Sequence, residues 1–305
     1  MPEWSIGLAW KASVPSRVPR VRIPPSPPDN VMPNQTTILQ VGSKSGIGLH
    51  SGELCSINLK PAPANTGIVF VVDDVEIPAT ADNAYGAGLC SGISGEGIEI
   101  KTVEHLMSAL KGNKIDNVYV EVFGPEIPLL DGSSIDFVRL IKQLGVWNFS
   151  TPRETVFIDK EIVVGDDTAW CKIEPSEELI FDFEIDFDHP LIGNSRYSFN
   201  ADQQKYNKTI APARTFGFSK DAKKLTEQGL ALGATLKSVI VLTSTGLASG
   251  PLRYNDEFVR HKILDAIGDT ALCGFPFKGK YTGFRAGHRL NIELAKEIRK
   301  QYQNR

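Results

Sequence analysis

Residues 181–187, within the predicted strand 179–187, carry the most constraining pattern in the sequence, a strict alternation of apolar and acidic side chains. The alternating residues are Phe181, Asp182, Phe183, Glu184, Ile185, Asp186 and Phe187. A period of two residues places successive side chains on opposite faces of a β-strand, so one face is buried and the other is wet. This alternation predicts a half-buried strand and is typical of an antiparallel sheet.

Short segments of strand character, separated by Gly, Pro and Asn, dominate the chain from Gln35 onward. The other predicted strands are 37–41, 55–60, 68–72, 118–123, 154–158 and 169–174. The predicted helices are 103–111 with Thr102 as cap, 135–144 with Ser133 or Ser134 as cap, 221–229, one from Asn255 or Asp256 to Cys273, and 292–301. Because strands and helices do not alternate strictly, the sequence predicts an α+β fold rather than a doubly wound sheet.

The length and charge of the chain limit its organisation and its partners. A chain of 305 residues corresponds to about two domains, and we place the boundary near 148–152, where a second strand-rich block begins. The 33 basic and 36 acidic residues give a net charge of −3, which argues against a dedicated nucleic-acid-binding protein. No stretch reaches the roughly 18 apolar residues of a transmembrane helix.

Four cysteines lie far apart in the sequence, namely Cys55, Cys90, Cys171 and Cys273. None forms a CxxC pair, so a thiolate zinc site is not indicated. Four cysteines are also too few for a disulfide scaffold in a chain of this length. The pattern favours reduced thiols that pack as small apolar residues in a cytosolic protein.

The first 31 residues differ from the rest of the chain. They are proline-rich and basic around residues 17–28 and show no apolar periodicity, so we expect them to be disordered. The favoured interpretation is a spurious extension, because SRVPRVRIPPSPP resembles the translation of a transfer-RNA gene; Met32 is then the true start. An organelle transit peptide and an authentic disordered tail are the alternatives.

The segment 102–106, TVEHL, is the first of three polar motifs that contain a histidine. Glu104 and His105 fall in the first turn of a predicted helix, where the positive end of the helix dipole favours an ionised Glu104. Neighbouring side chains on a helix diverge by about 100°. One of the two could therefore bind a metal while the other faces a ligand of that metal. A solvated glutamate beside an ordinary histidine is the alternative.

The predicted helix that ends at Cys273 has a polar arc and an apolar arc. The polar arc contains His261, Lys262, Asp265 and Asp269. The apolar arc contains Val259, Ile263, Ala266, Ile267 and Ala271. His261 and Asp265 are four residues apart, so they project together and can bind one cation. A solvated face is the alternative, but Phe258 and Leu272 on the polar arc indicate that it is partly covered.

The third motif is AGHRLN at 286–291, in which His288 follows a glycine and precedes a helix, as a loop catalyst or a simple cap does. Two histidines and one carboxylate with an open position form a catalytic zinc pattern. The same donors also describe a non-haem iron oxygenase. The chain lacks HExxH, GxSxG and GxxxxGK[ST] motifs, so the metalloprotease, serine hydrolase and P-loop signatures do not apply.

At these motifs the chain resembles the UDP-3-O-acyl-N-acetylglucosamine deacetylases, the zinc enzymes of bacterial lipid A synthesis. The matching segments follow the family's order and cover residues 35–300. They are GIGLHSG (46–52), PAPANTGI (61–68), TVEHLMSAL (102–110), PEIPLLDGSS (125–134), APARTFGF (211–218), LRYNDEFVRHKILDAIGD (252–269) and AGHRLN (286–291). The chain departs from the family pattern at 135–136, away from the chemical motifs.

The resemblance implies two similar layered domains, each a mostly antiparallel sheet packed with two helices, with the active site between them. Domain I is expected at 35–150 with a small insert near 83–99, and domain II at 153–303 with an insert near 219–242. In the family the second insert forms an apolar passage for the substrate's acyl chain. The apolar residues that agree with this are Leu225, Leu230, Leu232, Leu236, Val239 and Val241. A βαβ-like unit with its own small core is a compatible alternative.

The resemblance also assigns roles to individual residues. The implied zinc ligands are His105, His261 and Asp265. Glu104 is the implied general base, His288 the general acid, and Asp269 the carboxylate that orients His288. Lys262 and Thr215 polarise the substrate carbonyl or hold its oxyanion, and Phe216 lines the substrate site. His50 lies at the edge of the active site with its role open, and His189 is interpreted as structural.

The activity implied is Zn²⁺-dependent hydrolysis of the N-acetyl group of UDP-3-O-acyl-N-acetylglucosamine. The products are acetate and UDP-3-O-acyl-glucosamine, at the committed step of lipid A synthesis. We expect a monomer in the bacterial cytoplasm that binds a UDP-linked acylated amino sugar and no nucleic acid, with transient contact to the membrane or to enzymes of the acyl-carrier pathway. A metal-dependent amidohydrolase for a different N-acetyl sugar is the alternative enzyme. An inactive carbohydrate- or nucleotide-binding module requires loss of a ligand or of Glu104, and all are present.

Overall fold

The computed structural model describes residues 33–303. The expectations for residues 1–31, and for Met32 as the start, fall outside the described residues. The described part belongs to one compact unit. The division into domains at 150–153 and the two inserts stay predictions.

Two sheets repeat the same strand order. The first sheet has the order β2 (Gly42–Ile47), β3 (Leu54–Pro61), β9 (Val118–Phe123), β4 (Ile68–Val72) and β5 (Val75–Pro78). The second has the order β12 (Ile162–Asp166), β13 (Ala169–Glu174), β18 (Phe277–Phe284), β14 (Leu179–Phe187) and β15 (Gly193–Asn200), and β11 (Val156–Phe157) also pairs with β18. In each sheet the central strand is the one that comes last in the sequence. β9 is antiparallel to β3 and parallel to β4, and β18 is antiparallel to β13 and parallel to β14.

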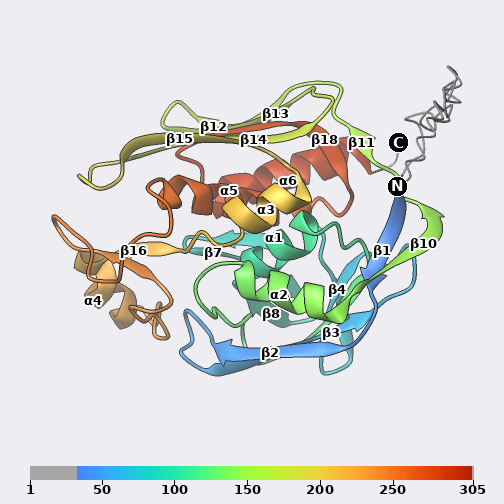
Figure 1. Cartoon of the computed structure of the whole chain (residues 1–305), viewed down its shortest axis with the longest axis horizontal. Coiled ribbons are helices and arrows are strands. Elements are labelled where there is room, and N and C mark those ends of the chain that lie inside the picture. The colour runs from blue at the N-terminus through green and yellow to red at the C-terminus, as the bar shows by residue number, and fades with distance from the viewer. Residues whose placement is uncertain (1–32, 304–305) are drawn as a thin grey trace, which may run out of the picture. The chain divides into compact units, whose positions relative to one another are not determined.

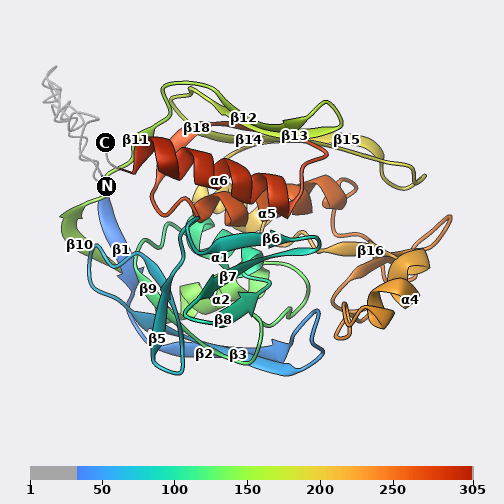
Figure 2. The same cartoon turned by 180° about the vertical axis from the view of Figure 1, so that it is seen from behind.

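Four helices form the two layers between these sheets (Figures 1 and 2). The helices nearest the first sheet are α1 (Glu104–Gly112) and α2 (Ile135–Leu144), and those nearest the second are α5 (Glu257–Ala271) and α6 (His288–Tyr302). Each sheet thus buries one face against a pair of helices. The predicted α+β class, rich in antiparallel sheet, is confirmed.

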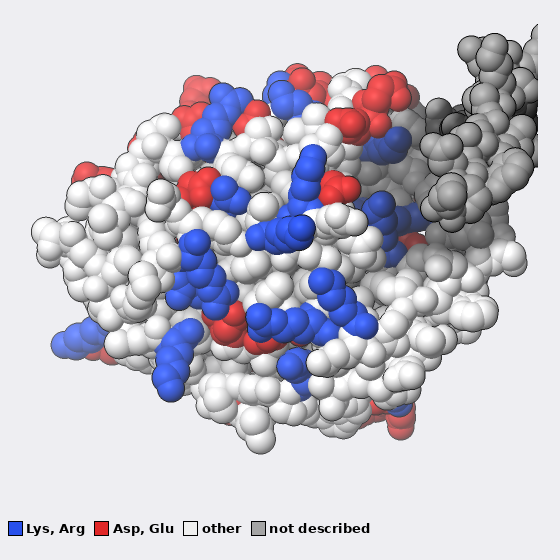
Figure 3. Space-filling model, in the orientation of Figure 1, with Lys and Arg blue, Asp and Glu red and all other residues white. Residues whose placement is uncertain are grey.

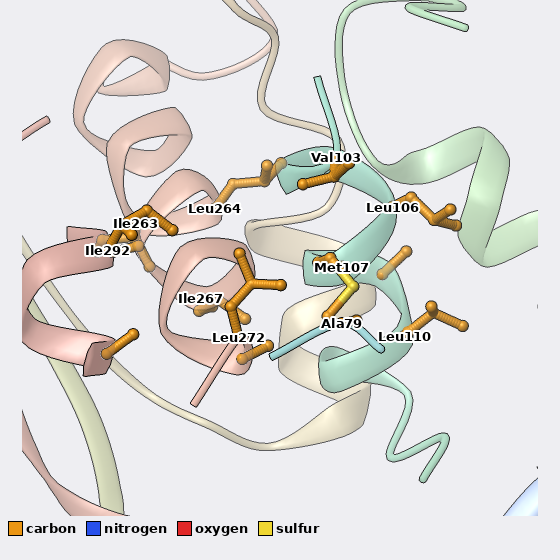
Figure 4. Packing of buried hydrophobic residues seen from close by; sticks show 14 of the residues in the cluster. Ala79, Val103, Leu106, Met107, Leu110, Ile263, Leu264, Ile267, Leu272 and Ile292 are labelled. Carbon is orange, nitrogen blue, oxygen red and sulfur yellow. The ribbon is translucent and has the colours of Figure 1, made fainter. Parts of the chain in front are cut away.

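The contact between α1 and α5 lies at the centre of this arrangement (Figure 4). The side chain of Met107 on α1 faces Leu264 and Ile267 of α5, whereas Leu106 points to the opposite side of α1; all four are buried. A Cβ atom on Gly268 of α5 would come within 2.1 Å of the Glu104 carbonyl oxygen. The glycine therefore allows the first turn of α1 to lie directly against the middle of α5.

Smaller elements lie outside the four layers. They are the ribbon of β1 (Asn34–Ile38) and β10 (Val146–Pro152), the three-stranded sheet of β6 (Ala84–Ala87), β7 (Cys90–Gly95) and β8 (Ile98–Lys101), the helix α3 (Gln203–Thr209), and β16 (Phe216–Phe218), α4 (Ser219–Glu227) and β17 (Ile240–Leu242). β16 and β17 are parallel and α4 connects them, which is a βαβ topology. No residue of α4 is buried.

Several predicted elements are confirmed, and one predicted cap is wrong. The strands 68–72, 118–123, 169–174 and 179–187 and the helix 135–144 have the predicted bounds. Thr102 does not cap α1: it has a positive φ of 60° and donates its hydroxyl to Glu126, and Val103 is the N-cap. Ser134 is the N-cap of α2 as predicted, although its hydroxyl donates to the His105 carbonyl and not to the helix. Both hydroxyl groups therefore bond to tertiary partners.

The alternating segment forms β14, and its pattern predicted the burial of its side chains better than the direction of its neighbouring strands. Phe181, Phe183 and Ile185 are buried as predicted, whereas Asp182 is buried too, because Arg196 on the neighbouring strand pairs with it. β14 is antiparallel to β15 but parallel to β18. The expectation of an antiparallel sheet is therefore wrong on one side of β14, since alternation reports which face of a strand is buried and not the direction of the neighbouring strands.

The helices and the cysteines of residues 33–303 can be compared with the expectations from composition. None of their helices is long and apolar enough to span a membrane. The four cysteines are buried and carry free thiols.

Candidate metal centre

Three side chains that could bind one metal ion meet where α1 contacts α5. His105 comes from the first turn of α1, and His261 and Asp265 lie one turn apart on α5. One possible ligand atom from each residue lies within 4.8 Å of the others. The Asp265 Oδ1 atom lies 3.3 Å from His261 Nε2 and 3.7 Å from His105 Nε2. The i, i+4 pair on α5 therefore converges as predicted and is joined by a histidine 156 residues earlier in the chain.

The three side chains suit a cation, because each is buried and offers a lone pair that no hydrogen bond from the described residues occupies. The Asp265 Oδ1 atom is buried without a hydrogen-bond donor among the described residues. The His261 Nδ1 atom lies 3.0 Å from the Ala213 carbonyl; if it donates there, Nε2 carries the lone pair that a metal requires. Burial lowers the pKa of His105 to about 3, so that imidazole is neutral.

The polar arc of α5 is not a solvated face. His261 and Asp265 are each 2% exposed, and Asp269 is fully buried. Burial disfavours the ionised form of Asp265, but His261, Lys262 and other cationic neighbours outweigh it and hold the pKa of Asp265 well below its usual range. The arc therefore concentrates charge inside the protein, which structural helices avoid unless the charges have partners.

Glu104, next to His105, is also buried in the first turn of α1. Its Oε2 atom accepts a hydrogen bond of 3.1 Å from the backbone N–H of Ser91 on β7. Burial raises the pKa of Glu104 to about 8, although the His288 charge opposes the shift. The expectation that the helix end favours an ionised Glu104 is thus outweighed by loss of solvent, and the carboxyl group holds its proton to a higher pH than an exposed glutamate does.

His288 lies between the candidate metal ligands and a second carboxylate. Its Nδ1 atom is 3.1 Å from Asp269 Oδ2, and its Nε2 atom is 4.0 Å from Asp265 Oδ2. Although burial disfavours the imidazolium, Asp269 raises the pKa of His288 to about 9. His288 is the first residue of α6, and Gly287 is the N-cap. His288 is therefore not a simple cap, and its contacts direct it toward the site.

Lys262 and Phe216 border the same cluster. The Lys262 ammonium donates to Asp265 Oδ2 at 2.8 Å and lies 5.7 Å from the centre of the Phe216 ring. Burial lowers the pKa of Lys262, but Asp265 outweighs it and leaves the pKa above its ordinary value. The Phe216 ring is 6.5 Å from the His261 ring. Both side chains therefore lie where a molecule bound beside the triad would touch them.

The structure does not bring Thr215 and His50 into contact with the triad. Among the described residues, neither forms a hydrogen bond or an ion pair with it. Thr215 is held by backbone hydrogen bonds to Gly132 and Ile240. His50 receives the Ala231 N–H at Nδ1, and its Nε2 atom is buried without a partner in the described part of the chain.

His189 lies away from the metal ligands and packs like a structural residue. Its Nε2 atom is 2.6 Å from the Thr243 carbonyl, and its ring lies edge-on to Phe218. It thereby connects the turn after β14 to the segment after β17.

Three polar residues at the site were not assigned from the sequence. Asn291 donates to Asp269 at 2.8 Å, and Glu126 accepts hydrogen bonds from the backbone of the His50 turn. Both lie inside the quoted motifs, so position in a motif was an available signal. Ser91 contacts both Glu104 and Asp269, but it lies in a strand without a motif, and nothing in the local sequence marks it.

Comparison with known proteins places this chain among deacetylases. A family profile described as UDP-3-O-acyl N-acetylglycosamine deacetylase matches residues 35–300. A protein of Nautilia profundicola is 44% identical over 266 residues, which cover 87% of this chain and 91% of that protein. Proteins of Wolinella succinogenes (42%, 88% of this chain and 91% of the relative) and Myxococcus xanthus (40%, 87% and 86%) are also similar. All three relatives are named UDP-3-O-acyl-N-acetylglucosamine deacetylase.

Proposed function

This chain belongs to the UDP-3-O-acyl-N-acetylglucosamine deacetylase family, and from that premise we propose that it hydrolyses the N-acetyl group of UDP-3-O-acyl-N-acetylglucosamine in lipid A synthesis. The products are acetate and UDP-3-O-acyl-glucosamine. The observation that carries the proposal is the buried cluster of His105, His261 and Asp265 with a proton acceptor and a proton donor beside it. An inactive binding module has no need for that arrangement.

We assign Zn²⁺ to the cluster, held by His105, His261 and Asp265. Two histidines and one carboxylate form a catalytic zinc set that leaves one coordination position free. When bound, the ion lowers the pKa of a water molecule toward about 7 and polarises a carbonyl group. The same donors suit Fe²⁺, so metal analysis of the purified protein distinguishes the two ions.

Glu104 starts the reaction as the general base. One of its oxygens, Oε2, is held by the Ser91 N–H, and we assign the proton transfer to the other oxygen, Oε1. It takes the proton of the attacking water as the new C–O bond forms at the acetyl carbon. The oxyanion that develops on the carbonyl is stabilised by the Lys262 ammonium and the Thr215 hydroxyl, and one such donor is worth about 2.7–4 kcal/mol.

His288 completes the reaction as the general acid. The departing amine is a poor leaving group unless it is protonated, and the imidazolium delivers a proton from Nε2 as the C–N bond breaks. Asp269 holds the other ring nitrogen and keeps the ring charged. Two catalysts are needed because one must begin deprotonated and the other protonated.

The pH dependence of kcat/KM tests the assignment of His288. The acid must be protonated, so the rate falls as pH rises through the pKa of His288, which Asp269 holds above its usual value. The base must be ionised, so the rate also falls at low pH. A bound cation lowers the raised pKa of Glu104 and moves this acidic limb. The alkaline limb is therefore the part of the profile that tests His288. We expect His288→Ala to lose this alkaline limb together with most of the rate. An unchanged limb in that variant would assign the proton donor elsewhere.

The segment from β16 to β17 supports an acyl-chain site. Leu232 and Leu236 are 51% and 55% exposed, and the backbone of Leu232 and Gly233 bonds to the turn that carries His50. In the orientation of Figure 1, the left side of the molecule shows few charged side chains above the position of α4 (Figure 3), whereas α4 itself is charged and exposed. An apolar surface beside the site suits the 3-O-acyl chain. A bound acyl chain would cover these leucines, which are exposed to solvent in the free protein.

The deciding experiment is a deacetylase assay with acyl chains of several lengths and with UDP-N-acetylglucosamine as the unacylated control. Each buried CH₂ contributes about 0.8 kcal/mol, so removal of two carbons lowers kcat/KM by about tenfold. Equal rates for the acylated and unacylated sugars would favour an amidohydrolase for a different N-acetyl sugar.

We further propose that the protein acts as a monomer in the bacterial cytoplasm. Its substrate is a nucleotide-linked lipid precursor, and contact with the membrane or with enzymes of the acyl-carrier pathway is transient.

A further inference from the structure

Ser91 on β7 makes two hydrogen bonds that reach different parts of the site. Its backbone N–H donates to Glu104 Oε2 at 3.1 Å, and its hydroxyl donates to Asp269 Oδ1 at 2.5 Å. Glu104 and Asp269 come from α1 and α5. Ser91 is fully buried, so no water competes for either bond. One residue therefore contacts both the proposed base and the carboxylate that holds the proposed acid.

The hydroxyl of Ser91 is one of three groups that orient the Asp269 carboxylate. Asn291 donates to Oδ2 at 2.8 Å, and the His288 ring nitrogen lies 3.1 Å from the same oxygen. Tyr281 in turn donates to Asn291. The hydroxyl of Ser91 is the partner of Oδ1, so it opposes rotation of the carboxylate about its Cβ–Cγ bond. Without it, the carboxylate is held at Oδ2 alone, and the partner of His288 is less firmly oriented.

We propose that Ser91 is a positioning residue that sets the placement of His288 relative to Glu104. This inference rests on the proposed function and adds to it. Proton delivery to the leaving nitrogen requires the donor within hydrogen-bond reach of that atom while the base side chain stays on the water. The contacts of Ser91 couple these two requirements through one rigid strand. Neither its amide nor its hydroxyl touches the reacting atoms, so the residue acts through its neighbours.

Removal of the hydroxyl alone tests this role. Ser91→Ala keeps the backbone N–H and its bond to Glu104. We expect kcat to fall by about 10- to 100-fold, the range typical of groups that orient a catalytic residue, with KM and metal content unchanged. Ser91→Thr restores the hydroxyl and the rate. Ser94→Ala on the same strand is the matched control, because its side chain forms no hydrogen bond within residues 33–303, and it keeps the wild-type rate.

A double-mutant cycle separates positioning from general structural damage. If Ser91 acts through His288, Ser91→Ala causes no further loss of kcat in a His288→Ala background. An equal loss in both backgrounds, or a full rate in Ser91→Ala, would overturn the inference.

A spectroscopic readout is independent of activity. In ¹⁵N-histidine-labelled protein, the Nδ1–H resonance of His288 is assigned by its absence in His288→Ala. We expect Ser91→Ala to shift this resonance and Ser94→Ala to leave it in place; no shift in Ser91→Ala contradicts the proposed role of the hydroxyl. A wild-type rate in His288→Ala would instead refute the assignment of the general acid in the proposed function, and the resonance would still report whether Ser91 orients Asp269.

Discussion

Glu104→Gln is expected to lower kcat by about 10²- to 10⁴-fold, the usual contribution of a general base, while the protein keeps its metal. The glutamine amide preserves the size of the side chain and the acceptor for the Ser91 N–H, but it cannot take a proton. The measurements are steady-state kinetics and metal analysis of the same preparation. Glu99→Gln is the matched control, since Glu99 lies on β8 and is exposed, and we expect it to keep both rate and metal.

A rate near that of the wild type in Glu104→Gln would remove Glu104 from proton transfer. The raised pKa of this side chain would then reflect burial and the neighbouring carboxylates Asp269 and Asp265, without a catalytic role. Loss of metal in Glu104→Gln would have a different meaning, because it would make Glu104 a ligand.

His261→Ala is expected to lose both bound metal and activity. The groups that only orient metal ligands contribute about 10- to 100-fold to affinity, so loss of a ligand itself should weaken binding by more than about 100-fold. The measurement is the metal stoichiometry of the protein after dialysis, together with kcat/KM. His189→Ala is the control, because His189 is buried but its contacts are with Thr243 and Phe218, and its metal stoichiometry should remain that of the wild type.

Metal removal from the unmodified protein completes this test. A chelator should abolish turnover, and one equivalent of Zn²⁺ should restore it. If His261→Ala keeps its metal while Glu104→Gln loses it, the assignment of ligand and base is reversed.

Local sequence patterns predicted several strands of the two sheets and the two helices that carry the candidate metal ligands. The period of two in 179–187 and the apolar blocks at 68–72 and 118–123 gave strands with the correct bounds, because backbone conformation follows from which side chains must be buried. The i, i+4 spacing of His261 and Asp265 likewise predicted that their side chains converge, since helix geometry alone determines it. Resemblance to a family then supplied the roles that spacing could not.

Long-range contacts decided the remainder. Thr102 has good capping chemistry, yet it bonds to Glu126 instead of α1. The alternation in β14 does not reveal that β18, which follows it by about 90 residues in the sequence, lies parallel beside it. A local pattern shows which side chains of a segment are more stable when buried than in water. The hydrogen bond of Thr102 and the direction of β18 depend instead on which distant segment packs beside them.

The sequence by itself determined the class of fold, the bounds of its clearest strands and helices, and the chemical character of each motif. Only the tertiary structure brought His105 to His261 and Asp265, placed Ser91 between Glu104 and Asp269, and removed all of them from solvent. The physical reason is that the pKa values and the metal affinity of these groups arise from burial and from charges on other elements. Those surroundings come into existence when α1 packs on α5, with Gly268 allowing the close approach.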